Sequence, residues 1–324
     1  ILNVRNITKV FPGTKALDDV SLSFESGKVN ALIGKNGSGK STLVKIINGA
    51  YLPDAGTLDI DGVPLKFENP SDAFDKGMAT VYQEMSLIPG LSVAENILIG
   101  RYETNGPFVD WKKTYAKAQS LLDEMGIDLP LRELVVNLSV WQCQVVEIVK
   151  AMSCRPKVIL LDEPTSALAQ HETRILFNLI RELKKKDVII IYITHRLQEL
   201  WEIADTSTVL RDGMAIGKVE MAGTLPKDIL KLMFGDVEVK DRPSDLQVYE
   251  EIVLEVKDFK STPWFEDISF TLKKGEVLGI AGMLGSGRTE LLRGIFGADK
   301  VESGTVILNG ETVLHPSPRS MRLR

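Results

Sequence analysis

The feature that most constrains the fold of this chain is a nine-residue stretch, GKNGSGKST, at residues 34–42. It follows an apolar run at residues 29–33 and leads into a segment whose apolar residues recur at helical spacing. Between a buried strand and a helix, a glycine-rich loop lets backbone amides surround an anion, and the helix N-terminus adds the positive end of its dipole. An ordinary glycine-rich turn is the weaker alternative because it needs neither flanking element. The predicted phosphate-binding residues are Gly34, Asn36, Gly37, Ser38, Gly39, Lys40, Ser41 and Thr42.

Composition narrows the class of protein. With 324 residues and 44% hydrophobic residues, the chain has room for two domains with sizeable cores. A net charge of −5 gives no basic footprint, so nucleic acid is not an expected partner. Cys143 and Cys154 lack metal-ligand spacing, which favours reduced thiols in a cytosolic compartment. The longest apolar run, at residues 188–193, is too short to cross a bilayer, so any membrane role is expected to be peripheral.

The order of apolar runs predicts an α/β fold. Strand-like runs broken by turns precede the phosphate loop, which indicates an antiparallel β layer. Continuous β-branched runs at residues 158–161 and 188–193 are typical of a parallel sheet covered on both faces. Between them and the loop, residues 92–153 read as a helical subdomain. Other predicted elements are helices at 40–48, 170–184 and 227–233, a hairpin at 58–65 about Asp61 and Gly62, and strands near 80–82, 206–210 and 214–219.

A tandem repeat sets the domain organisation. Residues 266–313 repeat residues 18–65 without a gap, since 282 − 34 = 248 places Gly282 on Gly34, and the same offset aligns further glycines, Gly285, Gly287, Gly297, Gly304 and Gly310 among them. We therefore expect a first domain at 1–235, a polar linker at 236–250 and the N-terminal part of a second domain at 251–324. Because the chain starts at Ile1 without Met and its second copy stops at Arg324, we expect a fragment of a longer protein.

Polar residues at strand ends supply the expected chemistry. Asp162 and Glu163 end an apolar run, where the carboxyl edge of a parallel sheet binds ligands. Asp162 would hold Mg²⁺ with Ser41, while Glu163 would polarise an attacking water and Lys40 would reach the outer phosphates. His195 also ends a strand and would meet the γ-phosphate, although a lone histidine there is commonly structural. Gln83, after another strand, could sense the metal or the water, and would be weak evidence alone.

The chain resembles the ATP-binding cassette (ABC) family. The loop, Gln83, the pair Leu138-Ser139, Asp162-Glu163 with the following PTSAL, and His195 stand in that family's order and spacing. Several stretches are similar to the double-cassette ATPases of bacterial monosaccharide importers, of ribose, galactose and xylose type: FPGTKAL at 11–17, VYQE at 81–84, LSV at 138–140 and IAGMLGSGRTEL at 280–291. The resemblance implies a P-loop NTPase cassette followed by the start of a second cassette. It also implies that Phe11 stacks on adenine, although Phe11 could equally pack a turn.

Three departures from the family pattern imply unequal sites. Trp141 replaces the glycine of the L-S-x-G-Q signature, where bulk and lost backbone freedom should hinder approach to the opposing nucleotide. Ala169 replaces an aspartate, and Arg288 replaces the lysine of the second loop. Because the family joins the loop of one cassette to the signature of the other, we expect one competent site and one degenerate site. The degenerate site would comprise Gly282, Gly285, Gly287, Arg288, Thr289, Ser139 and Trp141.

The resemblance implies a function. It predicts a Mg²⁺-dependent ATPase, peripheral on the cytoplasmic face of the plasma membrane, that powers sugar import through separate transmembrane permease subunits. A periplasmic or extracellular sugar-binding protein would be an indirect partner, and cassettes would dimerise within the chain or with another chain. One alternative is a soluble tandem cassette acting on ribosomes or nucleic acid, which the short linker and acidic balance disfavour. Another is a regulatory nucleotide-binding module with little turnover, which Trp141 favours.

Overall fold

The protein has two compact units, residues 1–237 and 238–324. A computed structural model describes residues 1–235, 247–282, 286–314 and 316–322. The expected linker at 236–250 therefore lies largely outside the described residues, which resume at 247 and enter a strand at Ile252. The two units are described separately below.

A largely parallel sheet forms the centre of the first unit, with strand order β12-β11-β3-β10-β9-β6. Strands β11, β3, β10, β9 and β6 run parallel, and β12 pairs with β11 in the antiparallel direction. β3 and β10 are buried at every position, because layers cover both faces of the sheet and select continuous apolar runs. The bounds are β3 Val29–Ile33, β6 Met78–Val81, β9 Val158–Asp162, β10 Ile189–Ile193, β11 Thr206–Arg211 and β12 Met214–Glu220.

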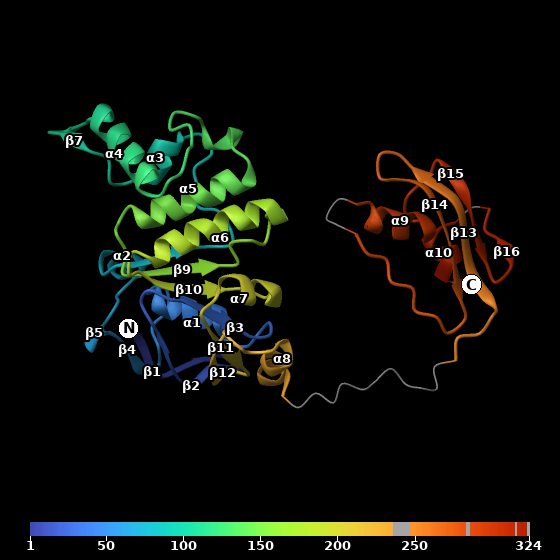
Figure 1. Cartoon of the computed structure of the whole chain (residues 1–324), viewed down its shortest axis with the longest axis horizontal. Helices are drawn as coiled ribbons and strands as arrows, with labels where there is room; N and C mark the ends of the chain where they lie inside the picture. Colours follow the sequence, from blue (N-terminus) through green and yellow to red (C-terminus); the bar gives the residue numbers. More distant parts are fainter. Residues whose placement is uncertain (236–246, 283–285, 315, 323–324) are drawn as a thin grey trace. The chain divides into compact units, whose positions relative to one another are not determined.

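A second, antiparallel sheet has the order β2-β1-β4-β5, which confirms the expected β layer. Its β4–β5 hairpin turns at Asp61 and Gly62, whose φ angles of 51° and 82° suit a two-residue turn. In Figure 1, this layer lies at the bottom of the first unit and helices α3–α5 lie at its top. The strand bounds are β1 Leu2–Phe11, β2 Thr14–Phe24, β4 Ala55–Ile60 and β5 Val63–Leu65.

The rest of the first unit is mostly helical, and it departs from the sequence prediction in three places. A hairpin of β7 (Thr104–Asn105) and β8 (Phe108–Val109) interrupts residues 92–153, where the sequence pattern predicts a helical subdomain. Helices α2 (Pro70–Asp75) and α7 (Leu197–Ile203) are too short to give a clear period of 3.6 residues. The others are α1 Lys40–Ile47, α3 Val93–Ile97, α4 Trp111–Glu124, α5 Val140–Met152, α6 Gln170–Lys184 and α8 Pro226–Phe234, with a 3₁₀ turn at Val135–Asn137.

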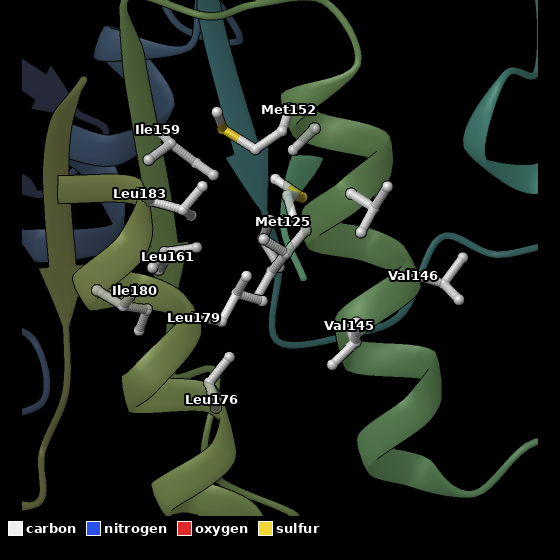
Figure 2. Packing of buried hydrophobic residues seen from close by; sticks show 14 of the residues in the cluster. Met125, Val145, Val146, Met152, Ile159, Leu161, Leu176, Leu179, Ile180 and Leu183 are labelled. Atoms are coloured by element: carbon white, nitrogen blue, oxygen red, sulfur yellow. The ribbon is translucent and has the colours of Figure 1, made fainter. Parts of the chain in front are cut away.

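The largest hydrophobic cluster joins the helical region to the sheet. Figure 2 shows α5 contributing Val145 and Met152 toward α6, whose Leu179 and Leu183 also face β9. Leu176, Leu179, Ile180 and Leu183 recur every three or four residues, so one stripe of α6 faces this core. The strand that carries Asp162, β9, is therefore packed against α6.

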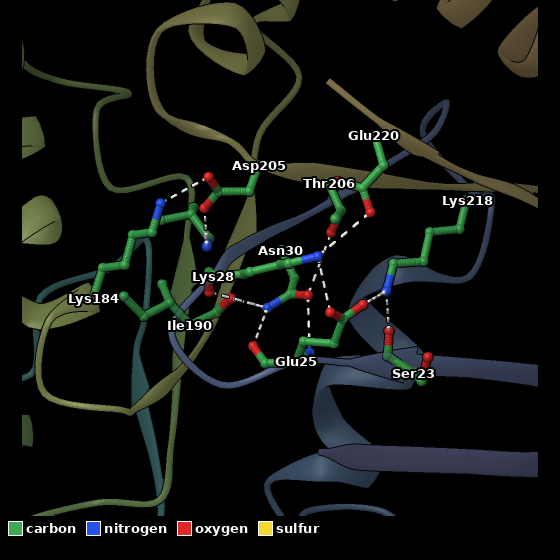
Figure 3. Close-up of polar contacts among 11 residues, drawn as sticks. Ser23, Glu25, Lys28, Asn30, Lys184, Ile190, Asp205, Thr206, Lys218 and Glu220 are labelled. Atoms are coloured by element: carbon green, nitrogen blue, oxygen red, sulfur yellow. Dashed lines mark hydrogen bonds and ion pairs between the residues drawn. The ribbon is translucent and has the colours of Figure 1, made fainter. Parts of the chain in front are cut away.

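Asn30 is a buried polar residue at the second position of β3. Its Nδ2 donates to the carbonyls of Glu25, Lys28 and Ile190 at 2.9, 3.1 and 3.1 Å, and its Oδ1 accepts from the Glu25 amide at 3.0 Å (Figure 3). Oδ1 also accepts from Thr206 Oγ1 at 3.3 Å. One side chain thus connects the turn before β3 to the neighbouring strands β10 and β11.

The second unit repeats the antiparallel layer of the first. Its sheet has the order β14-β13-β15-β16, and Leu254 pairs with Leu272 and Leu308 just as Leu2 pairs with Phe24 and Ile60. The offset is 272 − 24 = 248 for β14 but 254 − 2 = 252 for β13, so the first hairpin is four residues shorter. The elements are β13 Ile252–Ser261, β14 Phe265–Lys273, α9 Arg288–Ile295, β15 Ser303–Leu308, β16 Glu311–Thr312 and α10 Pro318–Arg322.

Residues 277–281 align with β3 but form no strand in the second unit. Val277 is 82% exposed, whereas the matching Val29 is fully buried. The physical reason is pairing: β3 bonds to β10 and β11, and no parallel strand accompanies 277–281 among the described residues.

Within the described ranges, no helix combines the length and the apolar character that a membrane span requires.

We expect Asn30→Ala to lower the free energy of unfolding by about 2–3 kcal/mol, because it leaves buried carbonyls without donors. Urea denaturation followed by circular dichroism measures the change. The exposed Asn178, whose side chain accepts from Arg181 on the same helix and from no other residue in the described ranges, provides the control. Asn178→Ala should change stability by less than about 0.5 kcal/mol. Equal effects of the two variants would contradict the bridging role of Asn30.

Candidate nucleotide-binding site

Close backbone approaches shape the loop between β3 and α1. Gly39 has a φ of 101°, and a Cβ there would lie 2.6 Å from the Ala16 carbonyl oxygen and 2.7 Å from Leu17 Cδ2. A Cβ on Gly34 would lie 2.2 Å from the Leu210 carbonyl oxygen. Both positions therefore require glycine, since any side chain would displace the backbone of a neighbouring strand. The motif glycines have a structural reason independent of any ligand.

Lys40, the first residue of α1, folds back over this loop. Its Nζ donates to the carbonyl oxygens of Gly34 and Lys35 at 2.8 and 2.9 Å. Burial lowers the pKa of Lys40, and the Glu163 and Asp162 carboxylates oppose that shift. The Lys40 ammonium thus lies within the electrostatic range of both acids predicted from the sequence.

An unpaired buried hydroxyl supports an anionic ligand at the loop. Ser38 Oγ is buried and has no hydrogen-bond partner among the described residues, although the Ser38 amide donates to Lys35 O at 3.1 Å. A buried unpaired donor is costly, and a phosphate oxygen would satisfy it. Asn36, Gly37 and Ser41 are exposed and Thr42 is partly exposed, so this side of the loop is open to a ligand.

Strand register brings the other predicted residues to the same edge. Ile193 at the end of β10 pairs with Leu32 of β3 and with Asp162 of β9, and Leu161 pairs with Val81 at the end of β6. The residues that follow these strand ends are the loop glycine Gly34, His195 two positions after Ile193, Glu163 and the Tyr82-Gln83 pair. Four parallel strands thus end in the four predicted polar segments.

Glu163 and His195 form the shortest contact between two predicted catalytic residues. His195 Nδ1 lies 3.0 Å from Glu163 Oε1, and the Glu163 amide donates to the Ile193 carbonyl at 3.0 Å. Glu163 adopts a φ of 47°, which is uncommon for a residue with a side chain and is found at strained functional turns. His195 and Glu163 have exposed side-chain fractions of 57% and 23%, so water can reach the pair.

Gln83 and Phe11 are less constrained. Gln83 is exposed and has no hydrogen-bond partner among the described residues, so its metal role stays a prediction. The ring of Phe11 contacts Tyr51 edge-on at 5.5 Å between centroids, and Lys9 Nζ lies 5.7 Å from its centre. Its stacking on adenine also stays a prediction. Sequence reasoning missed Tyr82, whose hydroxyl accepts from Asn48 Nδ2 at 2.9 Å and so connects β6 to the end of α1.

The oxygen donors at this edge suit magnesium. No group of three or more His, Cys, Asp or Glu side chains that could hold a metal occurs in the described part of the chain. Mg²⁺ does not need such a cage, because it commonly binds one or two protein oxygens together with substrate phosphates and water. A site from Ser41, Asp162 and Gln83 fits that mode, since Asp162 lies near enough to Lys40 to influence its pKa.

Ser139 and Trp141 lie at the start of α5. The Ser139 amide and Oγ both donate to Gln142 Oε1, at 2.9 and 3.0 Å, and so cap the helix. Trp141 lies in the first helical turn, a conformation that any residue adopts, and its half-buried ring packs on the core with Leu138. The argument from lost backbone freedom is therefore wrong at this position. What the tryptophan changes is side-chain bulk.

The second loop repeats part of this geometry. A Cβ on Gly287 would lie 2.3 Å from the Trp264 carbonyl oxygen, and Trp264 aligns with Ala16, which restricts Gly39. Gly285 lies outside the described residues, while Gly282 and Thr289 are exposed. Arg288 begins α9 and is exposed, and its guanidinium has no partner in the described ranges. Lys40 by contrast is held by its own loop.

The electrostatics of Asp162 yield a stability prediction. Burial raises the pKa of Asp162, with Glu163 adding to the shift, so the charged form is less favourable in the folded state than in the unfolded state. We expect Asp162→Asn to raise the unfolding temperature of the nucleotide-free chain at neutral pH. The advantage should shrink as pH falls through the folded-state pKa and should vanish below the ordinary value of 3.8, where the acid becomes neutral in both states.

Asp54 is a contrasting case, because its pKa is lowered in the folded state whereas that of Asp162 is raised. Lys9 and the Val10 amide lower the pKa of Asp54, which therefore contributes stability above pH 3.8 that is lost as pH falls through its folded-state pKa. Asp54→Asn should lower the unfolding temperature at neutral pH. Thermal scans of both variants across pH 3.5–7.5 (about four units) measure the contrast. A lower unfolding temperature for Asp162→Asn at neutral pH would contradict the burial argument.

Comparison with known proteins gives the site a context. The sequence model of the ABC transporter family matches residues 17–166 and 265–324. A ribose/galactose/methyl galactoside import ATP-binding protein of Agrobacterium fabrum is 44% identical over 98% of this chain. A galactose/methyl galactoside import ATP-binding protein of Haemophilus influenzae is 41% identical over 97% of it. The chain spans 63% and 62% of the lengths of these two relatives.

Solved structures agree in fold. A cassette of an ABC transporter in its ADP conformation superimposes with a TM-score of 0.63 at 29% identity, covering 73% of this chain and 99% of that one. A nucleotide-free cassette gives a TM-score of 0.60 at 30% identity, covering 68% and 91%. The predicted α/β cassette fold is confirmed. With the family model matching two separate stretches of the chain, the protein belongs to the ABC transporter ATP-binding family.

Proposed function

We propose that this protein binds Mg-ATP at residues 34–42 and hydrolyses it to power import of a monosaccharide through a separate membrane permease. The observation that carries the proposal is the 3.0 Å contact between Glu163 and His195, at the same sheet edge as the Lys40 loop. The names of the relatives, which are import ATP-binding proteins for ribose, galactose or methyl galactoside, supply the transport part.

Each residue has a proposed role in the in-line attack of water on the γ-phosphate. The loop amides, Ser38 and Lys40 bind phosphate oxygens, and Phe11 stacks on adenine. Ser41, Asp162 and Gln83 hold Mg²⁺, which neutralises developing charge when bound. Glu163 orients and polarises the water, and His195 fixes the carboxylate through Nδ1 while facing the γ-phosphate.

The proposed assembly is a pair of cassettes attached to permease subunits. The first cassette comprises residues 1–235 with a helical subdomain at about 92–153, and residues 251–324 begin a second, degenerate cassette. Pairing occurs with that second cassette or with another chain. The protein acts at the cytoplasmic face of the plasma membrane as a peripheral subunit, and a sugar-binding protein outside the membrane is its indirect partner. Nucleic acid is not a partner.

The two composite sites are proposed to be unequal. One uses the first loop with Asp162, Glu163 and His195, and needs a signature from the opposing cassette. The other joins Arg288 of the second loop to Ser139 and Trp141 of the first cassette. The exposed position of Arg288 and the bulk of Trp141 both favour a site that turns over slowly or not at all.

Of the two alternative functions, one is disfavoured and the other retains one supporting observation. The transport names of the relatives disfavour a soluble cassette acting on ribosomes or nucleic acid. A regulatory module with little turnover retains one supporting observation, the Trp141 bulk at the signature. Single-turnover hydrolysis by the full-length protein separates it from the transport ATPase, because only the latter releases phosphate within one binding event.

We expect Glu163→Gln to lower kcat by about 100-fold or more, because an amide cannot accept the proton of the attacking water. The variant should still bind Mg-ATP and hold it unhydrolysed. Arg288→Ala should change kcat little. Phosphate release by the full-length protein with its permease, and retention of labelled ATP on a filter, measure the two quantities.

Glu182→Gln is the matched control, because Glu182 is an exposed α6 residue whose one ion pair among the described residues is with Lys185. Its kcat should equal that of the wild type. Equal collapse of hydrolysis in Glu163→Gln and Arg288→Ala would contradict the unequal pair. Full activity of Glu163→Gln would contradict the proposed function itself.

A further inference from the structure

A buried carboxylate, Glu199 of α7, lies between the two catalytic turns and has no role in the reaction described so far. It is 6% exposed, and its oxygens accept three hydroxyl hydrogen bonds. Thr165 Oγ1 donates to Oε1 at 2.6 Å, while Tyr192 OH and Thr194 Oγ1 donate to Oε2 at 2.7 and 2.8 Å. Thr165, Tyr192 and Thr194 are themselves 1%, 0% and 2% exposed.

The donors come from two segments of the chain, the turn after β9 and the end of β10, and all three bind this one carboxylate. Thr165 follows Glu163 by two positions, and Thr194 directly precedes His195. Tyr192 lies inside β10, and its burial, with the Glu199 charge adding, raises the pKa of its phenol, so the hydroxyl keeps its proton and donates. One side chain therefore joins the turn after β9 to the turn after β10.

Arg196 reinforces the same connection from the outside. Its Nη2 donates to the Ser166 carbonyl at 3.1 Å, its amide donates to Thr194 Oγ1 at 2.9 Å, and its Nη1 lies 3.7 Å from Glu199 Oε1. The carboxylate is thus surrounded by three hydroxyls and a guanidinium. A buried carboxylate is tolerated only with such partners, and each partner's position is fixed in return.

We propose that Glu199 is a positioning residue for hydrolysis: by binding Thr165 and Thr194 with one carboxylate, it sets the distance between the Glu163 and His195 turns. This inference rests on the proposed ATPase function. Beside the Glu163–His195 contact of 3.0 Å, the bond from the Glu163 amide to the Ile193 carbonyl also joins the two turns. Glu163 also holds a left-handed φ of 47°, which the surrounding turn must maintain.

The consequence is a selective effect on the chemical step. The glycines of the loop at residues 34–42 lie so close to Ala16, Leu17 and Leu210 that a Cβ would clash there. None of these residues belongs to the Glu199 connection, so losing that connection should leave ATP binding intact. Misplacing a catalytic group by about 1 Å can lower the rate of reaction about 100-fold. A purely structural role would instead reduce unfolding temperature without separating kcat from nucleotide affinity.

Thr165 offers a matched pair of variants. Thr165→Val keeps the shape and removes the hydroxyl donor, whereas Thr165→Ser keeps the donor. With the full-length protein and its permease, we expect Thr165→Val to lower kcat about 10-fold or more with the Kd for Mg-ATP unchanged. Thr165→Ser should restore most of kcat, and Glu199→Gln should act like Thr165→Val. Unchanged kcat in Thr165→Val, or equal losses in kcat and in affinity, would overturn the inference.

Asp205→Asn controls for damage to α7. Asp205 lies just beyond the other end of that helix, accepts from the Val29 amide at 2.8 Å and pairs with Lys184 at 2.7 Å. This variant should lower the unfolding temperature and leave kcat at that of the wild type. If Asp205→Asn and Thr165→Val lower kcat alike, the effect is general destabilisation and the inference fails.

A second readout separates this inference from the proposed function. The chain has three histidines, so ¹⁵N-histidine spectra of the 324-residue chain can resolve the His195 imidazole, assigned with a His195→Gln variant. Its signals should shift in Thr165→Val and return in Thr165→Ser. Unshifted signals would overturn the positioning role even if hydrolysis were never observed. If the wild-type protein binds ATP without hydrolysing it, while Thr165→Val shifts the His195 signals and Thr165→Ser restores them, only the proposed function is contradicted.

Discussion

The parallel register of β3, β10 and β9 is the constraint on which the rest of the first unit depends. Ile193 pairs with Leu32 on one side and with Asp162 on the other, so three strands end level with one another. This register alone brings the phosphate loop, Glu163 and His195 to one edge of the sheet. A shift of one residue in β9 would turn Asp162 to the opposite face and separate the two acids from Lys40. Buried apolar side chains on both faces, including those from α5 and α6, oppose such a shift (Figure 2).

Sequence reasoning predicted those parts of the site that follow from local pattern. A glycine loop between a strand and a helix, and acids after an apolar run, identify their elements because their neighbours in sequence are also their neighbours in space. Glu199 could not be found in this way. Its partners Thr165, Tyr192 and Thr194 are ordinary strand and turn residues, and only the fold brings them to one carboxylate. The prediction about the backbone at Trp141 was wrong for a related reason, since the conformation of that residue depends on where α5 begins.

The second unit shows how far a repeat can be predicted. Aligned glycines gave one constant offset, and the strand pairs of β14 and β15 follow it. β13 does not, because the β13–β14 hairpin as a whole is four residues shorter than the β1–β2 hairpin, and the aligned glycines lie only after that hairpin. Every strand of the antiparallel layer has its counterpart in the second unit, including the pairing of β13 with β15, and the layer therefore repeats fully. Residues 277–281 need parallel partners distant in sequence, and a pattern of apolar residues cannot form a strand without them.

The Lys40 ammonium already has two acceptors, the carbonyls of Gly34 and Lys35. An incoming phosphate must therefore compete with the loop's own backbone for the same three hydrogens. Phosphate binding is an exchange of partners, and its net gain is the difference between two sets of charge-assisted hydrogen bonds. Removing the lysine would also release those two carbonyls and change the empty loop. The affinity lost on such a substitution would then report the stiffness of the unliganded loop as much as the strength of any phosphate contact.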